Sequence, residues 1–439
     1  MDVITIAAVT VFVVAYALIA TEKVHRVTAA LAGVAGMTLL GLFRSEGPLV
    51  SADSAFFTEH TGIDWNVVFL LFGMMIVVSV LRHTGLFEFI ALWAAQASKG
   101  RPIRLLLVLT LVTAFFSPIL DNVTVVLLVT PVTLSVCTRL KLAPAPYLIS
   151  LIFAANIGGT STLIGDPPNL IIGSRAGLTF ADFLVHALPL TIILLVVLVG
   201  TVAVVFRRQM RATIDVEEAL GDVNPSDAIP SKALLLRCLI VLALIMVVFS
   251  LHSVVPLDPS IVAMLGAGLM VIVSGTKAKQ FLAEVEWVTL SFFMALFVLV
   301  GALVEVGVIG QLGQIAAEQV AGREMAGVTG LLFGSAVLGA VVDNIPYTTA
   351  MAPIVSDMVA ATGSAGAASP LWWAFVFGAD LGGNMTGVAA GANVVVLGLA
   401  ARSGKPITFW QFTKYGIPFT LLTVGIAWLY VWLRYFVAT

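Results

Sequence analysis

One stretch inside the apolar segment 146–175 cannot form a regular helix, and it constrains the architecture of the whole chain. It reads Asn156-Ile157-Gly158-Gly159-Thr160-Ser161-Thr162-Leu163-Ile164-Gly165-Asp166-Pro167-Pro168-Asn169. Its glycines weaken a helix, and its two consecutive prolines remove helical hydrogen bonds. A second such stretch runs from Asp380-Leu381-Gly382-Gly383-Asn384-Met385-Thr386-Gly387 to Gly391-Ala392-Asn393. We therefore predict two interrupted helices, whose free carbonyls attract cations and whose helix N-termini attract anions.

The composition places these stretches in a membrane. Of 439 residues, 60% are hydrophobic and only 10% are charged, against roughly 45–50% and 25% in soluble domains. Windows without charge, such as Ile4–Ala20 and Ala187–Phe206, approach the ~20 residues that a spanning helix needs. The net charge of -2 offers no basic patch for nucleic acid. Cys137 and Cys238 lie in apolar runs, which suggests small core residues and neither a disulfide framework nor a metal site.

We predict an all-α polytopic membrane protein with about ten transmembrane helices and two re-entrant hairpins. The first apolar run has no basic leader or cleavage site, so we interpret it as a retained span. The hairpins are expected at 101–138 and 323–358, because Pro118 with Asp121 and Pro346 with Asp343 favour a turn in mid-segment. The predicted spans are 2–20, 27–43, 64–82, 146–175, 184–207, 232–251, 258–274, 287–304, 370–400 and 412–434.

Basic residues predict the orientation, since short cytoplasmic loops carry an excess of Lys and Arg. They fall on one side if each hairpin returns to the face it leaves, and both termini then face outward from the plasma (inner) membrane. The residues are Lys23, Arg26, Lys99, Arg101, Arg104, Arg139, Lys141, Arg207, Arg208, Arg211, Lys277, Lys279, Arg402 and Lys405. The segment Leu86–Ala97 is interpreted as an interfacial helix that links a fixed scaffold to a mobile unit, or as a plain membrane anchor.

The two halves of the chain repeat each other. A shift of 222 residues brings Trp65 onto Trp287, Asp121 onto Asp343, and Pro131 onto Pro353, and a further slip of two brings Gly158 onto Gly382 and Asn169 onto Asn393. We predict a first repeat at 1–214, a cytoplasmic linker at 215–231 and a second repeat at 232–439. Because five spans separate the two starts, the repeats are inverted, which places substrate and ion sites where their interrupted helices meet.

Four carboxylates lie in or beside the interruptions: Asp121, Asp166, Asp343 and Asp380. A carboxylate at mid-membrane is costly, so a function is the default explanation. Each is a candidate for sodium binding or proton exchange. The alternative is that each caps the N-terminus of a half-helix.

Asparagines and threonines supply neutral donors and acceptors, which suit a hydroxylated solute or an anion. Their alternative roles are hydrogen bonds between helices and, for threonine, to the local backbone. The histidines lack paired ligand spacing, so we predict neither a metal nor a catalytic site. The full predicted substrate- or ion-binding set is Asp121, Asn122, Thr124, Asn156, Gly158, Gly159, Thr160, Asp166, Asn169, Asp343, Asn344, Thr348, Asp380, Gly382, Gly383, Asn384 and Asn393.

These motifs resemble the ion transporter superfamily, in particular the branch of ArsB-type arsenite exporters and the melanosomal P protein. The resemblance covers nearly the whole chain and rests on 120–124, 156–169, 343–346, 381–384 and 392–393. It implies a dimerising scaffold domain and a transport domain that moves like an elevator. The Ser-Asn-Thr hairpin signature of related dicarboxylate carriers is replaced here by Asp121-Asn122-Val123 and Asp343-Asn344-Ile345, which argues against a dicarboxylate substrate.

We therefore predict a secondary transporter that exports arsenite or antimonite in exchange for protons. The alternative is a sodium/proton antiporter, or a transporter or channel for a simple anion. An enzyme is not expected, since no Ser-His or Asp-Asp motif of an intramembrane hydrolase is present. A coupling proton or sodium ion takes the place of a cofactor, the protein is expected to be a homodimer, and an ATPase partner stays open.

Overall fold

A computed structural model describes residues 3–21, 24–44, 47–58, 62–207, 209–210, 224–251 and 257–437, and these residues contain helices and no strands. Most of the predicted linker 215–231 lies outside these ranges. Only its end is described, as the short 3-10 helix η1 (Pro225–Ala228).

The helices of the first half begin and end close to the predicted positions. They are α1 (Val3–Thr21), α2 (Arg26–Gly41), α3 (Ala52–Phe56), α4 (Trp65–Arg82), α5 (Leu86–Ala97), α6 (Pro102–Leu120), α7 (Asn122–Arg139), α8 (Ala145–Gly159), α9 (Pro167–Ala176), α10 (Phe180–His186) and α11 (Leu188–Val205). The predicted span 184–207 is divided at Ala187, between α10 and α11.

The second half gives nearly the same series. It consists of α13 (Lys232–Ser250), α14 (Pro259–Ser274), α15 (Ala278–Glu284), α16 (Trp287–Glu305), α17 (Val308–Val320), α18 (Glu324–Val342), α19 (Asn344–Thr362), η2 (Gly366–Ala368), α20 (Pro370–Gly382), α21 (Gly391–Arg402), α22 (Phe409–Trp432) and the π-helical turn η3 (Leu433–Val437).

Nine helices of the described chain are long and apolar enough to cross a membrane, so the protein is a multi-pass membrane protein. Six of the ten predicted spans have such a helix. The spans 27–43 and 258–274 contain the 16-residue helices α2 and α14, and the other two contain the interrupted pairs. Three hairpin helices, α6, α7 and α18, also meet the criterion. The re-entrant character of the hairpins stays a prediction.

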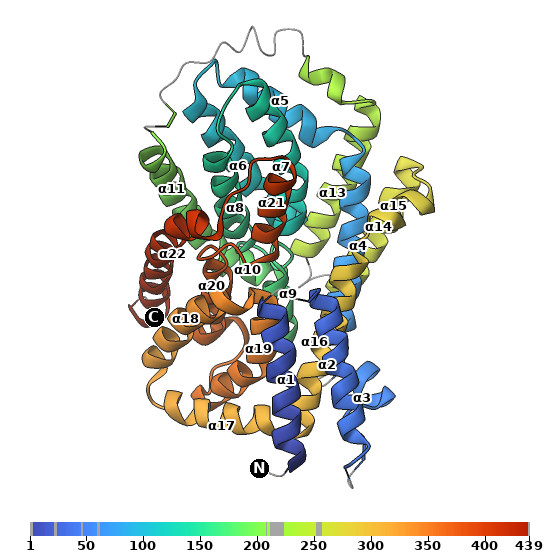
Figure 1. Ribbon diagram of the computed structural model, residues 1–439, viewed down its shortest axis with the longest axis vertical. Coiled ribbons are helices and arrows are strands. Elements are labelled where there is room, and N and C mark those ends of the chain that lie inside the picture. Colours follow the sequence, from blue (N-terminus) through green and yellow to red (C-terminus); the bar gives the residue numbers. More distant parts are fainter. Residues whose placement is uncertain are drawn as a thin grey trace.

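The two halves run in opposite directions (Figure 1). Helix α5 and the hairpin α6–α7 occupy the upper end of the molecule, whereas α17 and the hairpin α18–α19 occupy the lower end. The packing follows the same symmetry, since α4 packs against α14 and α2 against α16. We call α1–α4 and α13–α16 the scaffold group. The exact repeat boundaries, 1–214 and 232–439, stay a prediction.

The hairpins and interrupted helices also pack in equivalent pairs. Helix α6 lies against α8 and α18 against α20, while each second hairpin helix reaches the opposite half, α7 to α21 and α19 to α9. We call α6–α9 and α18–α21 the site group. Because each pair across the halves joins a hairpin to an interrupted helix, the unusual segments of both halves meet in one place.

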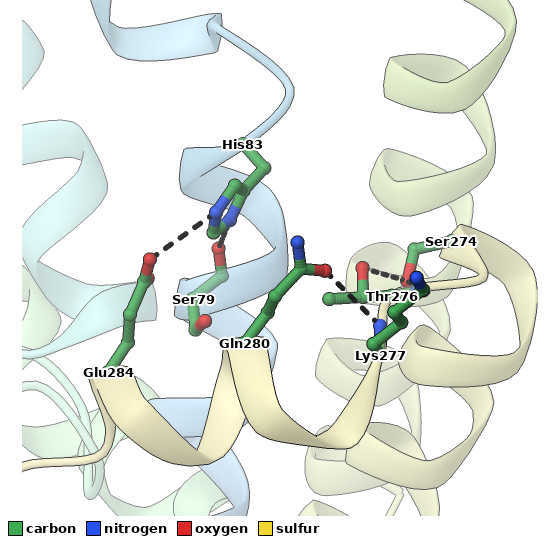
Figure 2. Close-up of polar contacts among 7 residues, drawn as sticks. All are labelled: Ser79, His83, Ser274, Thr276, Lys277, Gln280 and Glu284. Carbon is green, nitrogen blue, oxygen red and sulfur yellow. Dashed lines mark hydrogen bonds and ion pairs between the residues drawn. The ribbon is translucent and has the colours of Figure 1, made fainter.

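A polar contact ties the end of α4 to α15 within the scaffold group (Figure 2). The His83 Nδ1–H group donates to the Ser79 carbonyl oxygen at 2.8 Å, and Nε2 of the same ring lies 3.3 Å from the Glu284 carboxylate. The side chain of Gln280 accepts from the Lys277 amide at 3.3 Å and begins α15. The His83 and Glu284 side chains are partly exposed, so their contact adds little stability.

Two equivalent glycines allow the hairpins to approach the interrupted helices. A Cβ on Gly158 would lie 2.5 Å from the Ala114 carbonyl oxygen, and one on Gly382 would lie 2.7 Å from that of Ala336. Both neighbours are backbone atoms that cannot rotate away. These glycines therefore set the distance between α6 and α8 and between α18 and α20.

We expect Gly158→Ala and Gly382→Ala each to lower the free energy of unfolding by about 1–3 kcal/mol, the usual cost of overpacking. Thermal unfolding of the purified protein in detergent measures the change. Gly334→Ala is the matched control, because Gly334 is also helical but a Cβ added there would have no neighbour within 4 Å. The control should be neutral or stabilising by up to about 1 kcal/mol, and equal effects at all three sites would contradict the packing role.

Candidate functional site

Both predicted interruptions are present, and each is paired with the tip of a hairpin. Helix α8 ends at Gly159 and α9 begins at Pro167, where the missing proline N–H costs nothing. The backbone N–H of Asn122 at the first tip donates to the Gly165 carbonyl at 2.9 Å. The backbone N–H of Asn344 at the second tip donates to the Ala389 carbonyl at 3.0 Å. The hairpin tips thus supply hydrogen bonds that the interrupted helices lack.

Two equivalent asparagines donate to further backbone carbonyls of the interruptions. The Asn169 Nδ2 amide donates to the carbonyls of Gly159 at 3.2 Å and Thr162 at 2.9 Å. The Asn393 Nδ2 amide donates to Gly383 at 2.6 Å and Thr386 at 2.8 Å. Both side chains are fully buried. In each half the asparagine at the start of the second half-helix bonds to the end of the first one. We call Asn169 and Asn393 the clasp asparagines.

Other predicted residues form one buried cluster that joins the two halves. The Asn122 Nδ2 amide donates to Asp166 Oδ2 at 2.7 Å and to Asn156 Oδ1 at 3.1 Å. The Asn156 Nδ2 amide in turn donates to Asn384 Oδ1 at 3.0 Å and Asn393 Oδ1 at 3.2 Å. A continuous polar network therefore runs from the first hairpin tip through α8 to the interruption between α20 and α21.

Asp121 and Asp343 cap the second helix of each hairpin. The Asp121 carboxylate accepts from the Thr124 amide at 2.7 Å and the Thr124 hydroxyl at 2.6 Å. The Asp343 carboxylate accepts from the Ile345 amide at 3.1 Å. Both residues have positive φ, 69° and 72°, in a region that costs a non-glycine residue about 1–3 kcal/mol. The capping alternative is thus realised, and such strain at two equivalent positions marks a site under constraint.

Asp166 and Asp380 are the two fully buried acids of the cluster. Asp166 also interacts with the Asn344 side chain without reaching hydrogen-bond geometry, and its charge interacts with those of Asp380, Asp121 and Asp343. Several buried atoms of the described cluster have no standard hydrogen bond: Asn122 Oδ1, Asp166 Oδ1, Asn169 Oδ1, Asn344 Nδ2, Thr348 Oγ1, Asp380 Oδ1 and Oδ2, and Asn384 Nδ2. Within the described ranges, no three His, Cys, Asp or Glu side chains are grouped to hold a metal ion.

The remaining predicted residues contribute backbone and packing. Thr160 donates its hydroxyl to the Asn156 carbonyl at 2.9 Å. Gly159 and Gly383 are buried at the C-terminal ends of α8 and α20, and a Cβ on Gly383 would lie 3.6 Å from Asn156 Nδ2. Their small size keeps the backbone next to the amide cluster.

Arg26 is a residue that the sequence assigned to a cytoplasmic loop and that instead lies beside the site group. Its guanidinium donates to the Thr289 hydroxyl at 3.4 Å and lies 5.3 Å from the centre of the Phe292 ring. A Cβ on Gly391, at the start of α21, would lie 3.9 Å from its Nη1. No local sequence signal distinguishes Arg26 from the basic loop residues around it.

A polar cavity of about 440 Å³ lies between the scaffold group and the site group. Its wall includes Asp64 and Asn66 of the scaffold, Ser174 and Arg175 of α9, and Thr349 of α19. The Ser174 hydroxyl donates to the Asp64 carboxylate across the boundary between the groups. Thr349 directly follows Thr348, so the cavity reaches the neighbourhood of the second hairpin tip.

Inverted halves, paired hairpins and interrupted helices around buried polar groups define this multi-pass membrane protein as a secondary transporter. The chain belongs to the CitMHS family, described as citrate transporter, whose family model matches residues 16–378. Membership of the ion transporter superfamily, expected from the motifs, is thereby confirmed.

Individual relatives agree with this assignment. The chain is 45% identical over 438 residues to the uncharacterized transporter Mb2703 of Mycobacterium bovis, covering 99% of both. It is 32% identical over 499 residues to the P protein of Homo sapiens, covering 95% of this chain and 58% of the P protein. The YdaH transporter of Alcanivorax borkumensis has the same fold, with a TM-score of 0.61 over 99% of both chains at 15% identity.

We expect Asn169→Ala and Asn393→Ala each to lower the free energy of unfolding by about 1–3 kcal/mol, since each loses two buried side-chain hydrogen bonds worth about 0.5–1.5 kcal/mol apiece. Thermal unfolding in detergent tests this. Asn66→Ala is the control, because the exposed Asn66 side chain only accepts from Ser260, and its change should stay below about 1 kcal/mol. Unfolding temperatures that match the control would show that the clasps are dispensable.

Proposed function

We propose that the protein exports arsenite or antimonite, as the neutral trihydroxide, in exchange for protons. The proposal rests on an excess of hydrogen-bond acceptors over donors among the buried atoms of the cluster that have no standard hydrogen bond. Three are acceptor oxygens on Asn122, Asp166 and Asn169, and two more belong to the Asp380 carboxyl. The amide donors are those of Asn344 and Asn384, and the Thr348 hydroxyl can donate or accept. A ligand that completes this set must bring donors or a positive charge.

The trihydroxide meets this requirement, since it carries three O–H donors and needs few donors in return. A citrate ion would bring further carboxylates into a buried site that already holds Asp166, and the repulsion would be strong there. The citrate named in the family description is therefore not our first choice. A sodium ion would also suit the acceptors, which keeps a sodium/proton antiporter as the second candidate.

An elevator movement is proposed for the site group against the scaffold group. Few polar contacts cross between them in the described chain, among them Ser174 to Asp64 and the Tyr16 hydroxyl to the Pro346 carbonyl at 2.9 Å. Such contacts are easily exchanged when one group slides past the other. We further propose a homodimer built on the scaffold group, and a location in the plasma membrane with both termini outside.

We expect purified protein in liposomes to move arsenite under an imposed pH gradient, and cells that produce it to survive arsenite. Asp121→Asn and Asp343→Asn should lower the flux about tenfold or more, because each removes an ionisable group from a hairpin tip while the amide can still cap the helix. Asp227→Asn, exposed on η1, is the control and should transport normally.

Parallel assays with sodium, chloride and citrate separate the candidates. Sodium-driven pH changes without arsenite flux would replace our proposal with the antiporter, and citrate flux would reject the argument from acceptor excess. If none of the four solutes moves, the protein does not transport any of them and the proposal is wrong.

A cross-link tests the elevator. In the double variant Asp64→Cys and Ser174→Cys, oxidation is expected to join the groups where their side chains already touch and to stop transport, and reduction should restore it. The single variants under the same oxidant are the controls, since Cys137 and Cys238 are buried. Undiminished transport by a fully cross-linked protein would rule out relative movement of the two groups.

A further inference from the structure

One position of the site carries an amide side chain in the first half and a carboxyl in the second. A shift of 224 residues brings Asn156 of α8 onto Asp380 of α20, and both side chains are fully buried. The same shift brings Thr160 onto Asn384, and Asn169 onto Asn393. The equivalent side chains therefore have nearly the same surroundings but differ in one ionisable group.

In the first half, this position acts as a hydrogen-bond donor toward the opposite interruption. The Asn156 amide donates to the side-chain oxygens of Asn384 and Asn393, as described above. Asn393 accepts there because its own two amide hydrogens are held by the carbonyls of Gly383 and Thr386. The surroundings thus require a donor at this position.

In the second half, Asp380 faces the equivalent pair, Thr160 and Asn169. Both amide hydrogens of Asn169 are already donated to Gly159 and Thr162, and the Thr160 hydroxyl is donated to the Asn156 carbonyl. Rotating the Asn169 amide would point its oxygen at two carbonyl oxygens, so that exchange is unfavourable. Because these donor hydrogens are used elsewhere, a protonated Asp380 carboxyl could donate to the Asn169 side-chain oxygen, which has no hydrogen bond of its own among the described residues.

The charged neighbours act in the same direction. Asp166, in the interruption before α9, interacts with Asp380, and Asp121 and Asp343 at the hairpin tips interact with Asp166. Titratable groups on the other elements packed along α20 lie against its aromatic residues: Tyr347 of α19 on Phe375, Tyr430 of α22 on Phe377, and His186 of α10 on Trp373. Repulsion among the four acids disfavours their being ionised all at once.

We propose that Asp380 takes up and releases the exchanged proton, and that Asn156 is its permanently neutral counterpart. The idea rests on the proposed proton coupling, but not on the identity of the solute. The described conformation corresponds to the protonated carboxyl. Loss of the proton turns the contact between Asp380 and Asn169 into a repulsion between the two halves, which links proton release to rearrangement of the site group.

Infrared spectroscopy of purified protein in lipid tests the protonated state without any substrate. At neutral pH the wild type should show the C=O stretch of a protonated carboxyl, and Asp380→Asn should lose it while remaining folded, because the amide copies Asn156. Asp380→Glu should shift the band. The mirror variant Asn156→Asp should add a second band, and Glu318→Gln, on the exposed face of α17, should change nothing.

Transport by the same variants tests the exchange. In Asp380→Asn, flux driven by a pH gradient should be lost, whereas Glu318→Gln should transport like the wild type. A carboxyl band that survives Asp380→Asn, or pH-driven flux that survives it, would overturn the inference. If the band behaves as expected but the wild type moves no arsenite, the proposed substrate is wrong and the role of Asp380 stands.

Discussion

Backbone hydrogen bonding in a membrane is the constraint on which this structure depends. Two helices stop within apolar segments, and in lipid their free carbonyl and amide groups have no water with which to form hydrogen bonds. The hairpin tips and the Asn169 and Asn393 side chains supply partners instead. Hairpins, interruptions and clasp asparagines are therefore one unit, and none of them is stable in this form without the others.

The same constraint produces the candidate site. An asparagine that spends both amide hydrogens on the backbone leaves its oxygen directed at the opposite half. In this way the repair of one interruption provides an acceptor for the other, and the amide of Asn156 uses such an acceptor on Asn393. Structural and functional roles coincide at these positions, which explains why the cluster is buried, polar and short of donors at once.

Inverted repetition makes the two halves comparable residue by residue, and their differences are informative. Asp121 and Asp343 share the same strained backbone and the same capping role, whereas Asp166 and Asp380 have Ala390 and Asn156 as their counterparts. The acids that differ between the halves are also the fully buried ones. Symmetry thus accounts for the architecture, whereas each half carries one buried acid that the other half lacks.

The membrane location, the repeat and the two interruptions could be predicted from the sequence alone, because apolar length, prolines and glycines act locally on the chain. It also selected the asparagines and acids of the cluster. The roles of these residues became visible only in the folded chain. Asp121 and Asp343 cap helices, and Gly158 and Gly382 let the backbone of a hairpin helix approach closely. Arg26 lies near Gly391. Those roles depend on contacts between segments that lie far apart in the chain. No local sequence pattern shows which donor hydrogens are already used in other hydrogen bonds.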